Sequence, residues 1–252
     1  MVLAIEGGIT VAVGIMTVPE RAEHCRRLVD RIGGEIAVHV DVNHRGCWAA
    51  WKATWIACAL AQPRATHIAI LADDTAVCSD LRATLEALVA ARPHSPIAGW
   101  LPRDQVELAH AQGLRWASTR RLQFVQLLVL PRELGDRALD WICDREHLFG
   151  DLWGTWDDER LKGFTLAHDL DTFVPVPNVC DHLGGDGTIK STFGHRFAPE
   201  SARARVWLGE DGRGAALDWS DLRAVGDQPV HPYRIPRILL TPYNTTHDEV
   251  PP

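Results

Sequence analysis

The stretch THIAILADDT, residues 66–75, is apolar from Ile68 to Ala72 and then changes abruptly to the adjacent carboxylates Asp73 and Asp74. A short apolar run bounded by polar residues is typical of a buried strand. We therefore predict a strand over 66–71 whose C-terminal end presents the two carboxylates in a loop. Because successive side chains of a strand point to opposite faces, Asp73 and Asp74 are expected to point in different directions and to do different jobs.

The segments before this strand alternate between strand and helix patterns. Residues 10–15 and 35–42 are β-branched and apolar, whereas residues 20–32 and 47–61 carry apolar side chains at helical spacing. This alternation predicts an α/β fold with parallel strands and right-handed crossovers. Ligands of such sheets bind beyond the carboxyl ends of the strands. Those ends carry residues 17–21, 41–46 and 73–75.

The second half of the chain is less regular. Residues 122–131 and 172–179 are expected to form further strands, and residues 132–142 a helix. Beyond residue 191 the sequence has few periodic segments. We therefore expect one catalytic domain over 1–192 and an irregular C-terminal extension over 193–252 that packs on the active site or covers it.

Composition restricts the class of protein. The chain has 252 residues and a formal net charge of −7, which argues against a protein that coats nucleic acid nonspecifically. It shows no run long enough for a membrane helix and no signal-peptide pattern, so we expect no membrane partner and a cytoplasmic location. Six scattered cysteines without a CxxC pair predict buried free thiols.

Four acidic or imidazole-bearing residues follow predicted strands or precede a predicted helix. Asp74 offers hard oxygen ligands for Mn²⁺ or Mg²⁺. The segment WDDERL places Asp157 and Asp158 at a helix start, where a carboxylate can take a proton from an acceptor hydroxyl. The segment NVCDHLGG places His182 after a strand, where an imidazole can complete a metal shell. The plainer alternative is that the acidic pairs cap helices or start turns.

These residues resemble the nucleotide-diphospho-sugar transferases of GT-A fold, whose metal motif is an acidic pair at a strand end. The resemblance covers residues 10–192. The patterns TVPER, RGCWAAWKATW, THIAILADDT and PNVCDHLGG further resemble phage-type glycosyltransferases, among them those associated with TET-like oxygenases. The resemblance implies a Rossmann-like, mostly parallel central sheet flanked by helices. It also implies transfer of a sugar from a UDP-sugar to 5-hydroxymethylcytosine in phage DNA, in the host cytoplasm if the chain is phage-encoded.

Carried over by position, the resemblance implies a role for each matching residue. Asp74 and His182 would hold the metal, and Asp158, beside Asp157, would be the base of an inverting displacement. The donor nucleotide would be bound by Thr17, Pro19, Arg21, Asp41, Gly46, Trp48, Lys52 and Asp73, with Lys190 on a glycine-rich loop near the diphosphate. The chain departs from the usual DxD pattern at Ala72, which leaves the metal shell open.

Other readings of the same residues stay open. The acceptor can instead be a saccharide, a protein or a small molecule, and a non-catalytic nucleotide-sugar-binding module would need Asp74 but not Asp158. A nuclease would gather more carboxylates for two metals. For double-stranded DNA as a partner, the sequence itself offers a possible basic strip and two tryptophans able to stack on a base: Arg115, Arg120, Arg121, Arg196, Arg203, Arg205, Trp116 and Trp207.

Overall fold

The computed structural model describes residues 8–101, 104–120, 122, 126–149, 157–183 and 203–227. The strands are β1 (Val11–Thr17), β2 (Ile36–Val40), β3 (His67–Ala72), β4 (Thr75–Val77), β5 (Ile97–Ala98), β6 (Trp116–Thr119), β7 (Leu127–Pro131), β8 (Thr172–Pro175), β9 (Cys180–His182) and β10 (Ala224–Val225). The helices are η1 (Pro19–Arg21, a 3-10 turn), α1 (Ala22–Ile32), α2 (Cys47–Ala61), α3 (Leu81–Ala91), α4 (Asp104–Ala111), α5 (Arg132–Cys143), α6 (Glu146–Phe149) and α7 (Asp157–Ala167).

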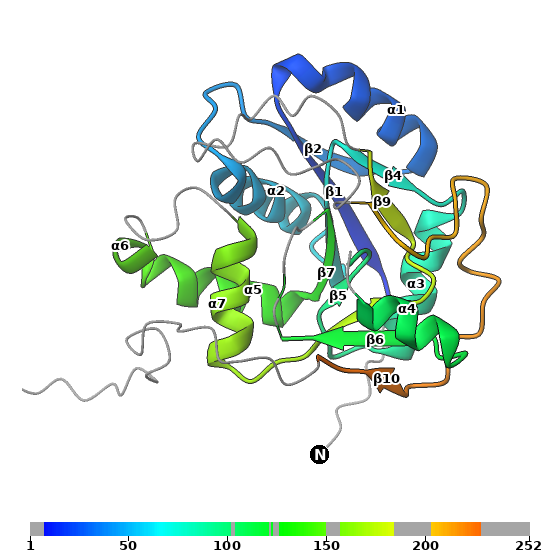
Figure 1. Cartoon of the computed structure of the whole chain (residues 1–252). Helices are drawn as coiled ribbons and strands as arrows, with labels where there is room; N and C mark the ends of the chain where they lie inside the picture. The colour runs from blue at the N-terminus through cyan, green and yellow to red at the C-terminus, as the bar shows by residue number, and fades with distance from the viewer. Residues whose placement is uncertain are drawn as a thin grey trace, which may run out of the picture.

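A central sheet of the order β10-β6-β8-β5-β7-β3-β1-β2 forms the middle layer (Figure 1). Strands β1, β2 and β3 are parallel, as the alternating pattern predicts. The expectation of a mostly parallel sheet holds only for this part. β7 runs antiparallel to both β3 and β5, and β6 runs antiparallel to β8, so the sheet as a whole is mixed. The α/β class is confirmed.

Alternation along the central strands divides the core into two layers. In β3, Ile68 and Ile70 face one hydrophobic cluster, which contains apolar residues of α2, α5 and α7. Ala69 and Leu71 face the other cluster, which contains residues of α1 and α3. Helices therefore cover both faces of the sheet, as both faces of a buried central strand require.

Helix α2 lies close to the sheet because glycine leaves room for it. A Cβ atom on Gly14 of β1 would lie 2.5 Å from Thr54 Cγ2 and 2.6 Å from Cys58 Sγ. The same helix carries three stacked indoles, with ring centroids 5.6 Å apart for Trp48 and Trp51 and 5.3 Å apart for Trp51 and Trp55. All three indoles are buried, so this side of the sheet is filled by aromatic packing.

Gly135→Ala is expected to destabilise the fold by about 3 kcal/mol, because an added methyl group would overpack a closed core. The new Cβ would lie 1.9 Å from Trp55 Cη2, and the Trp55 indole is held by a hydrogen bond from its Nε1 to Asp136 Oδ1. Urea unfolding measures the loss. The control is Gly226→Ala, where the nearest atom lies at an ordinary 3.5 Å, and equal stability of the two variants would contradict the packing described.

Residues 203–227 run along the outside of the domain and add to its sheet. β10 pairs with β6 at the sheet edge (Figure 1), and Trp219 packs against Trp116 in the core. Asp80 accepts hydrogen bonds from the backbone N–H groups of Gly214 and Ala215. This segment is therefore built into the domain by specific contacts, although its sequence lacks a clear period.

The six cysteines are free, and the expectation that all are buried is wrong for two of them. Cys143 is exposed at the end of α5 and Cys47 is half-buried at the start of α2. Within the described ranges, the helices are all too short or too polar to cross a lipid bilayer.

Candidate functional site

The carboxyl ends of β1 and β3 meet at a cluster around Asp73. Because β1 and β3 are adjacent and parallel, their ends lie side by side. Thr17 Oγ1 donates to Asp73 Oδ2 at 2.5 Å. Arg21, in the turn that follows β1, donates from Nη1 to Asp73 Oδ1 at 2.8 Å and to Asp74 Oδ2 at 2.9 Å. Both oxygens of Asp73 therefore have donors, and one guanidinium joins the two carboxylates.

His182 reaches Asp74 through a second pair of strands. β4, which directly follows Asp74, runs antiparallel to β9 with Thr75 opposite His182. The Leu183 N–H donates to the Asp74 carbonyl at 2.8 Å, and His182 Nε2 lies 3.3 Å from Asp74 Oδ2. Asp74 Oδ1 is buried and has no hydrogen-bond partner among the described residues. One oxygen of Asp74 is thus left for a ligand.

The pKa values of the two adjacent carboxylates are shifted in opposite directions. Burial raises the pKa of Asp73, and the hydrogen bonds from Thr17 and Arg21 offset this only in part. Burial also acts to raise the pKa of Asp74, but His182 and Arg21 outweigh it and the net pKa is lowered. Asp74 is therefore the member of the pair that stays ionised most readily.

Arg21→Met is expected to destabilise the metal-free protein by about 3 kcal/mol, because it leaves two neighbouring carboxylates without their shared cation. Added Mn²⁺ should restore the melting temperature of this variant more than it raises that of the wild type, since the ion takes over the charge of Arg21. Thermal unfolding with and without Mn²⁺ measures both effects. Arg26→Met is the control because Arg26 makes exposed ion pairs, and an equal metal response in all three proteins would contradict this account.

A second buried acidic pair lies at the start of α7. Helix α7 begins at Asp157, so the pair forms its first two residues and does not precede it. Asp157 Oδ1 accepts from the Asp158 N–H and Asp158 Oδ1 from the Glu159 N–H, each at 2.9 Å. One oxygen of each carboxylate therefore accepts a backbone N–H of the first turn of α7, as the alternative of a helix-capping pair predicts. Both side chains are nonetheless buried, which capping does not require.

Cys47, the first residue of α2, connects the two acidic pairs. Burial and then the charges of Asp157, Asp158 and Asp74, in that order of strength, raise the pKa of the Cys47 thiol. Helices α2 and α7 are in contact. Carboxylates from both pairs therefore act on the same thiol at the N-terminal end of α2, although more than eighty residues separate them in sequence.

The loop between β2 and α2 borders this cluster. Asp41 is buried at the end of β2, and its Oδ2 accepts from the Gly46 N–H at 3.1 Å. Gly46 has a φ of 98°, which a side chain would disfavour, and it caps α2. Asp41 therefore shapes the loop, and its buried Oδ1 makes no hydrogen bond to any described residue.

Three of the predicted donor-binding residues, Trp48, Lys52 and Pro19, have surroundings other than the cluster around Asp73. Trp48 is buried in the indole stack, so its ring packs against protein. Lys52 lies one turn further along α2, 3.8 Å from Glu146. Pro19 is exposed at the start of the 3-10 turn, and Lys190 lies outside the described residues.

Three of the arginines of the predicted basic strip that the structure describes are paired with carboxylates. Arg120 pairs with Asp169 and Asp171, Arg205 with Asp104 and Glu107, and Arg203 with Asp181. Trp116 is fully buried, so the expectation that it stacks on an extruded base is wrong. Arg121 and Arg196 lie outside the described residues.

Two residues that the sequence patterns did not single out belong to the site. Arg160 is buried on α7, with its guanidinium carbon 5.8 Å from the Trp48 ring centroid. Asp181 is buried beside His182 and accepts from the Arg203 Nε and the Ala204 N–H, both at 2.6 Å. In the sequence, each of the two is a charged residue inside an otherwise apolar or helical segment. Such a pattern does not show whether the charged side chain is buried or exposed.

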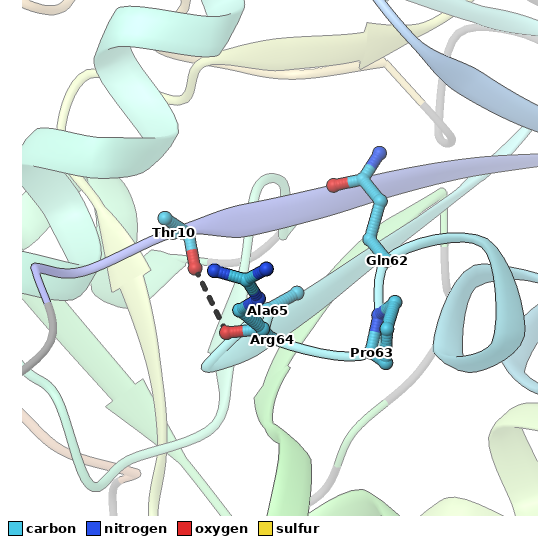
Figure 2. A pocket seen from close by; sticks show the side chains of 5 residues that line it. All are labelled: Thr10, Gln62, Pro63, Arg64 and Ala65. Carbon is cyan, nitrogen blue, oxygen red and sulfur yellow. Dashed lines mark hydrogen bonds between the residues drawn. The ribbon is translucent and has the colours of Figure 1, made fainter.

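A shallow pocket lies at the opposite end of the sheet and is unrelated to this cluster. It has a volume of about 330 Å³ and is lined by Thr10 and residues 62–65, which precede β1 and β3 (Figure 2). Thr10 Oγ1 donates to the Arg64 carbonyl at 3.3 Å. None of these five described lining residues carries an acidic or imidazole group.

Comparison with known proteins adds no family. A scan against protein-family models gave no match, and a search of curated proteins gave no significant match. Nor do three or more His, Cys, Asp or Glu side chains gather into a metal-binding group within the described part of the chain. The two acidic pairs, Arg21 and His182 are therefore the residues that indicate a function.

Proposed function

We propose that the chain is a metal-dependent glycosyltransferase of GT-A type that transfers a sugar from a nucleotide-sugar donor to an acceptor hydroxyl by inversion. The observation that supports the proposal most is that Asp74, which contacts His182, and the buried pair Asp157 and Asp158 all act on the thiol at the N-terminal end of α2. One pair supplies ligands for a cation and the other supplies a base. These are the two chemical parts that such a transfer needs.

The residues present suit a divalent cation that is completed by its substrate. Asp74 and His182 provide one carboxylate and one imidazole, a ligand set compatible with Mn²⁺, and Asp74 Oδ1 has no hydrogen-bond partner among the described residues. Mg²⁺ and Mn²⁺ at phosphate-transferring sites commonly take one or two protein ligands and oxygens of the substrate. Two protein ligands therefore favour a site that is filled together with a diphosphate, which is the part of a UDP-sugar that we expect here.

The residues of the site each supply one part of the proposed reaction. Asp73 holds Arg21 in place, and Arg21 adds positive charge beside the diphosphate. A bound divalent cation supplies Lewis-acid stabilisation of the departing nucleoside diphosphate. A carboxylate of the Asp157–Asp158 pair takes the proton of the acceptor hydroxyl. The burial of that pair excludes water from the base.

The burial of Asp157 and Asp158 favours an enzyme over a non-catalytic binding module. Two adjacent buried carboxylates are unfavourable for folding, and nucleotide binding at Asp74 does not require them. Costly groups of this kind are retained at sites where they perform chemistry.

The acceptor is the less constrained part of the proposal. Our resemblance-based candidate is 5-hydroxymethylcytosine in double-stranded DNA, but the paired arginines give it no support from the described surface. A saccharide, protein or small-molecule hydroxyl is the alternative.

Turnover with a panel of nucleotide sugars and Mn²⁺ tests the proposal. Each donor is incubated with 5-hydroxymethylcytosine DNA, with unmodified DNA and with saccharide acceptors, and products are identified by mass spectrometry. A glycosylated product in any acceptor class supports the transferase. A product on modified DNA alone, weakening steeply as salt is raised, identifies the acceptor as DNA. Absence of product with every donor and acceptor would contradict the proposed function.

A further inference from the structure

We propose that Asp157 is the catalytic base and that Asp158 positions it, which reverses the roles implied by the resemblance. The inference rests on the proposed function, since it assigns one step of that reaction to one oxygen atom. Three observations on the described residues distinguish the two carboxylates.

The first observation is the hydrogen bonding of the pair. Asp157 Oδ1 is occupied by the Asp158 N–H, but Asp157 Oδ2 is buried and has no hydrogen-bond partner among the described residues. Asp158 Oδ1 is occupied by the Glu159 N–H, and Asp158 takes part in at least one further interaction. Buried polar atoms are normally paired, so an open carboxylate oxygen at this place indicates a ligand that is bound during function.

The second observation is the strength with which each carboxylate acts on the Cys47 thiol. Asp157 acts on the Cys47 thiol more strongly than Asp158 does, and Asp74 acts on the same thiol. Asp157 is therefore the member of its pair that interacts more strongly with the thiol at the N-terminal end of α2, on which Asp74 also acts.

The third observation is the electrostatic surroundings of Asp157. Burial and then the neighbouring Asp158 raise the pKa of Asp157 to about 7, and Arg160 opposes this shift. On α2 the nearby titratable groups are Cys47 and Lys52, while Glu146 of α6 acts on Arg160. Helix α5 contacts α7 through Trp141, which packs on Phe164 and His168. A base whose pKa lies near neutral pH accepts a proton in the reaction and releases it to water afterwards.

The step balances without any further reactant. Asp157 Oδ2 takes the proton of the acceptor hydroxyl, and the electron pair left on the hydroxyl oxygen forms the bond to the anomeric carbon. The bond from that carbon to the phosphate oxygen breaks, and its electron pair leaves with the nucleoside diphosphate. The Asp158 N–H holds Asp157 Oδ1, and the negative charge of Asp158 raises the pKa of Asp157 and so strengthens it as a base, without touching the acceptor.

Asp157→Asn and Asp158→Asn, compared across pH, test this assignment. We expect Asp157→Asn to lower kcat by about a thousandfold, the usual size of a general-base effect, with unchanged donor affinity. Asp158→Asn should lower kcat roughly tenfold and shift the midpoint of the kcat–pH profile downward, because it removes a neighbouring negative charge. Asp144→Asn, at the exposed end of α5, is the control for removal of a carboxylate.

Each outcome separates the two proposals. A larger loss in Asp158→Asn than in Asp157→Asn, with an active wild type, would overturn the assignment of the base and leave the transferase intact. A wild type inactive with all donors and acceptors would instead overturn the proposed function. Donor affinity and circular dichroism of each variant show whether it folds, and ¹³C NMR titration of labelled aspartate measures the proton affinity of Asp157 directly.

Discussion

Asp74→Asn will reduce metal-dependent turnover by about a thousandfold or more, which corresponds to roughly 4 kcal/mol of transition-state stabilisation. The substitution keeps the size of the side chain but replaces an anionic ligand with a neutral amide. In the structure, Asp74 Oδ2 is shared by Arg21 and His182, and Oδ1 is buried without a hydrogen-bond partner among the described residues. Loss of the charge therefore weakens both the contact to His182 and the attraction for a cation.

The measurement is kcat at saturating donor over a Mn²⁺ titration. Asp74→Asn should show a low rate that no concentration of Mn²⁺ restores, whereas Asp30→Asn, on the exposed face of α1, should behave as the wild type. A variant that regains full activity at high Mn²⁺ would indicate that the ion is held elsewhere.

Asp157→Asn is expected to make the metal-free protein more stable at pH 8, by roughly 2 to 4 kcal/mol, while it removes activity. The folded-state pKa of Asp157, about 7, lies well above that of an unfolded chain. A group shifted in this direction contributes stability that is fully present below about pH 4 and is lost as pH rises through 7. An amide never ionises, so the variant avoids that loss.

Chemical unfolding of both proteins in chelator from pH 4 to pH 8 measures the effect. The two curves should agree at pH 4 and separate as pH rises, with the wild type falling below the variant. A variant less stable than the wild type at pH 8 would show that the buried charge is better compensated than the contacts of Asp157 indicate. Asp144→Asn again serves as the exposed control and should follow the wild type throughout.

Local patterns in the sequence predicted the strands that carry the first half of the site. The runs around β1, β2 and β3 and the helix over 47–61 are confirmed, because apolar periodicity reports directly on burial. Parallel pairing of these strands predicted that residues 17–21 and 73–75 lie along one edge of the sheet, and β1 and β3 pair in this way. The general position of the site beyond the carboxyl ends followed from the same rule.

The same local patterns did not predict which strands pair when they are distant in sequence. The run over 122–131 reads as a buried strand whatever its direction, and no strand was predicted over 116–119, where β6 lies, so the antiparallel pairs of the mixed sheet were not predicted. The union of β4 with β9 joins residues more than one hundred positions apart and brings His182 to Asp74. The sequence also did not show which way side chains point. The aromatic rings of Trp48 and Trp116 are suited to stacking on a ligand, but both are buried against protein.

The segment over 203–227 shows a different limit. Its polar, glycine-containing sequence has no helical or strand period, but Asp80, Trp116 and Arg92 hold it by hydrogen bonds and ring contacts. Arg92 lies between the rings of Trp116 and Phe173, with its guanidinium carbon 3.5 Å from the Phe173 ring centroid. Such anchoring by individual contacts leaves no signal in a sequence window.

Calorimetric titration of a nucleoside diphosphate into the protein, with and without Mn²⁺, tests the central claim most directly. Wild-type protein should bind UDP, or another nucleoside diphosphate of the panel, at least tenfold more tightly with Mn²⁺ than in chelator, and Asp74→Asn should lose that difference. Binding that is indifferent to Mn²⁺, or no binding of any nucleoside diphosphate, would contradict a metal-dependent nucleotide-sugar site at Asp74 and His182.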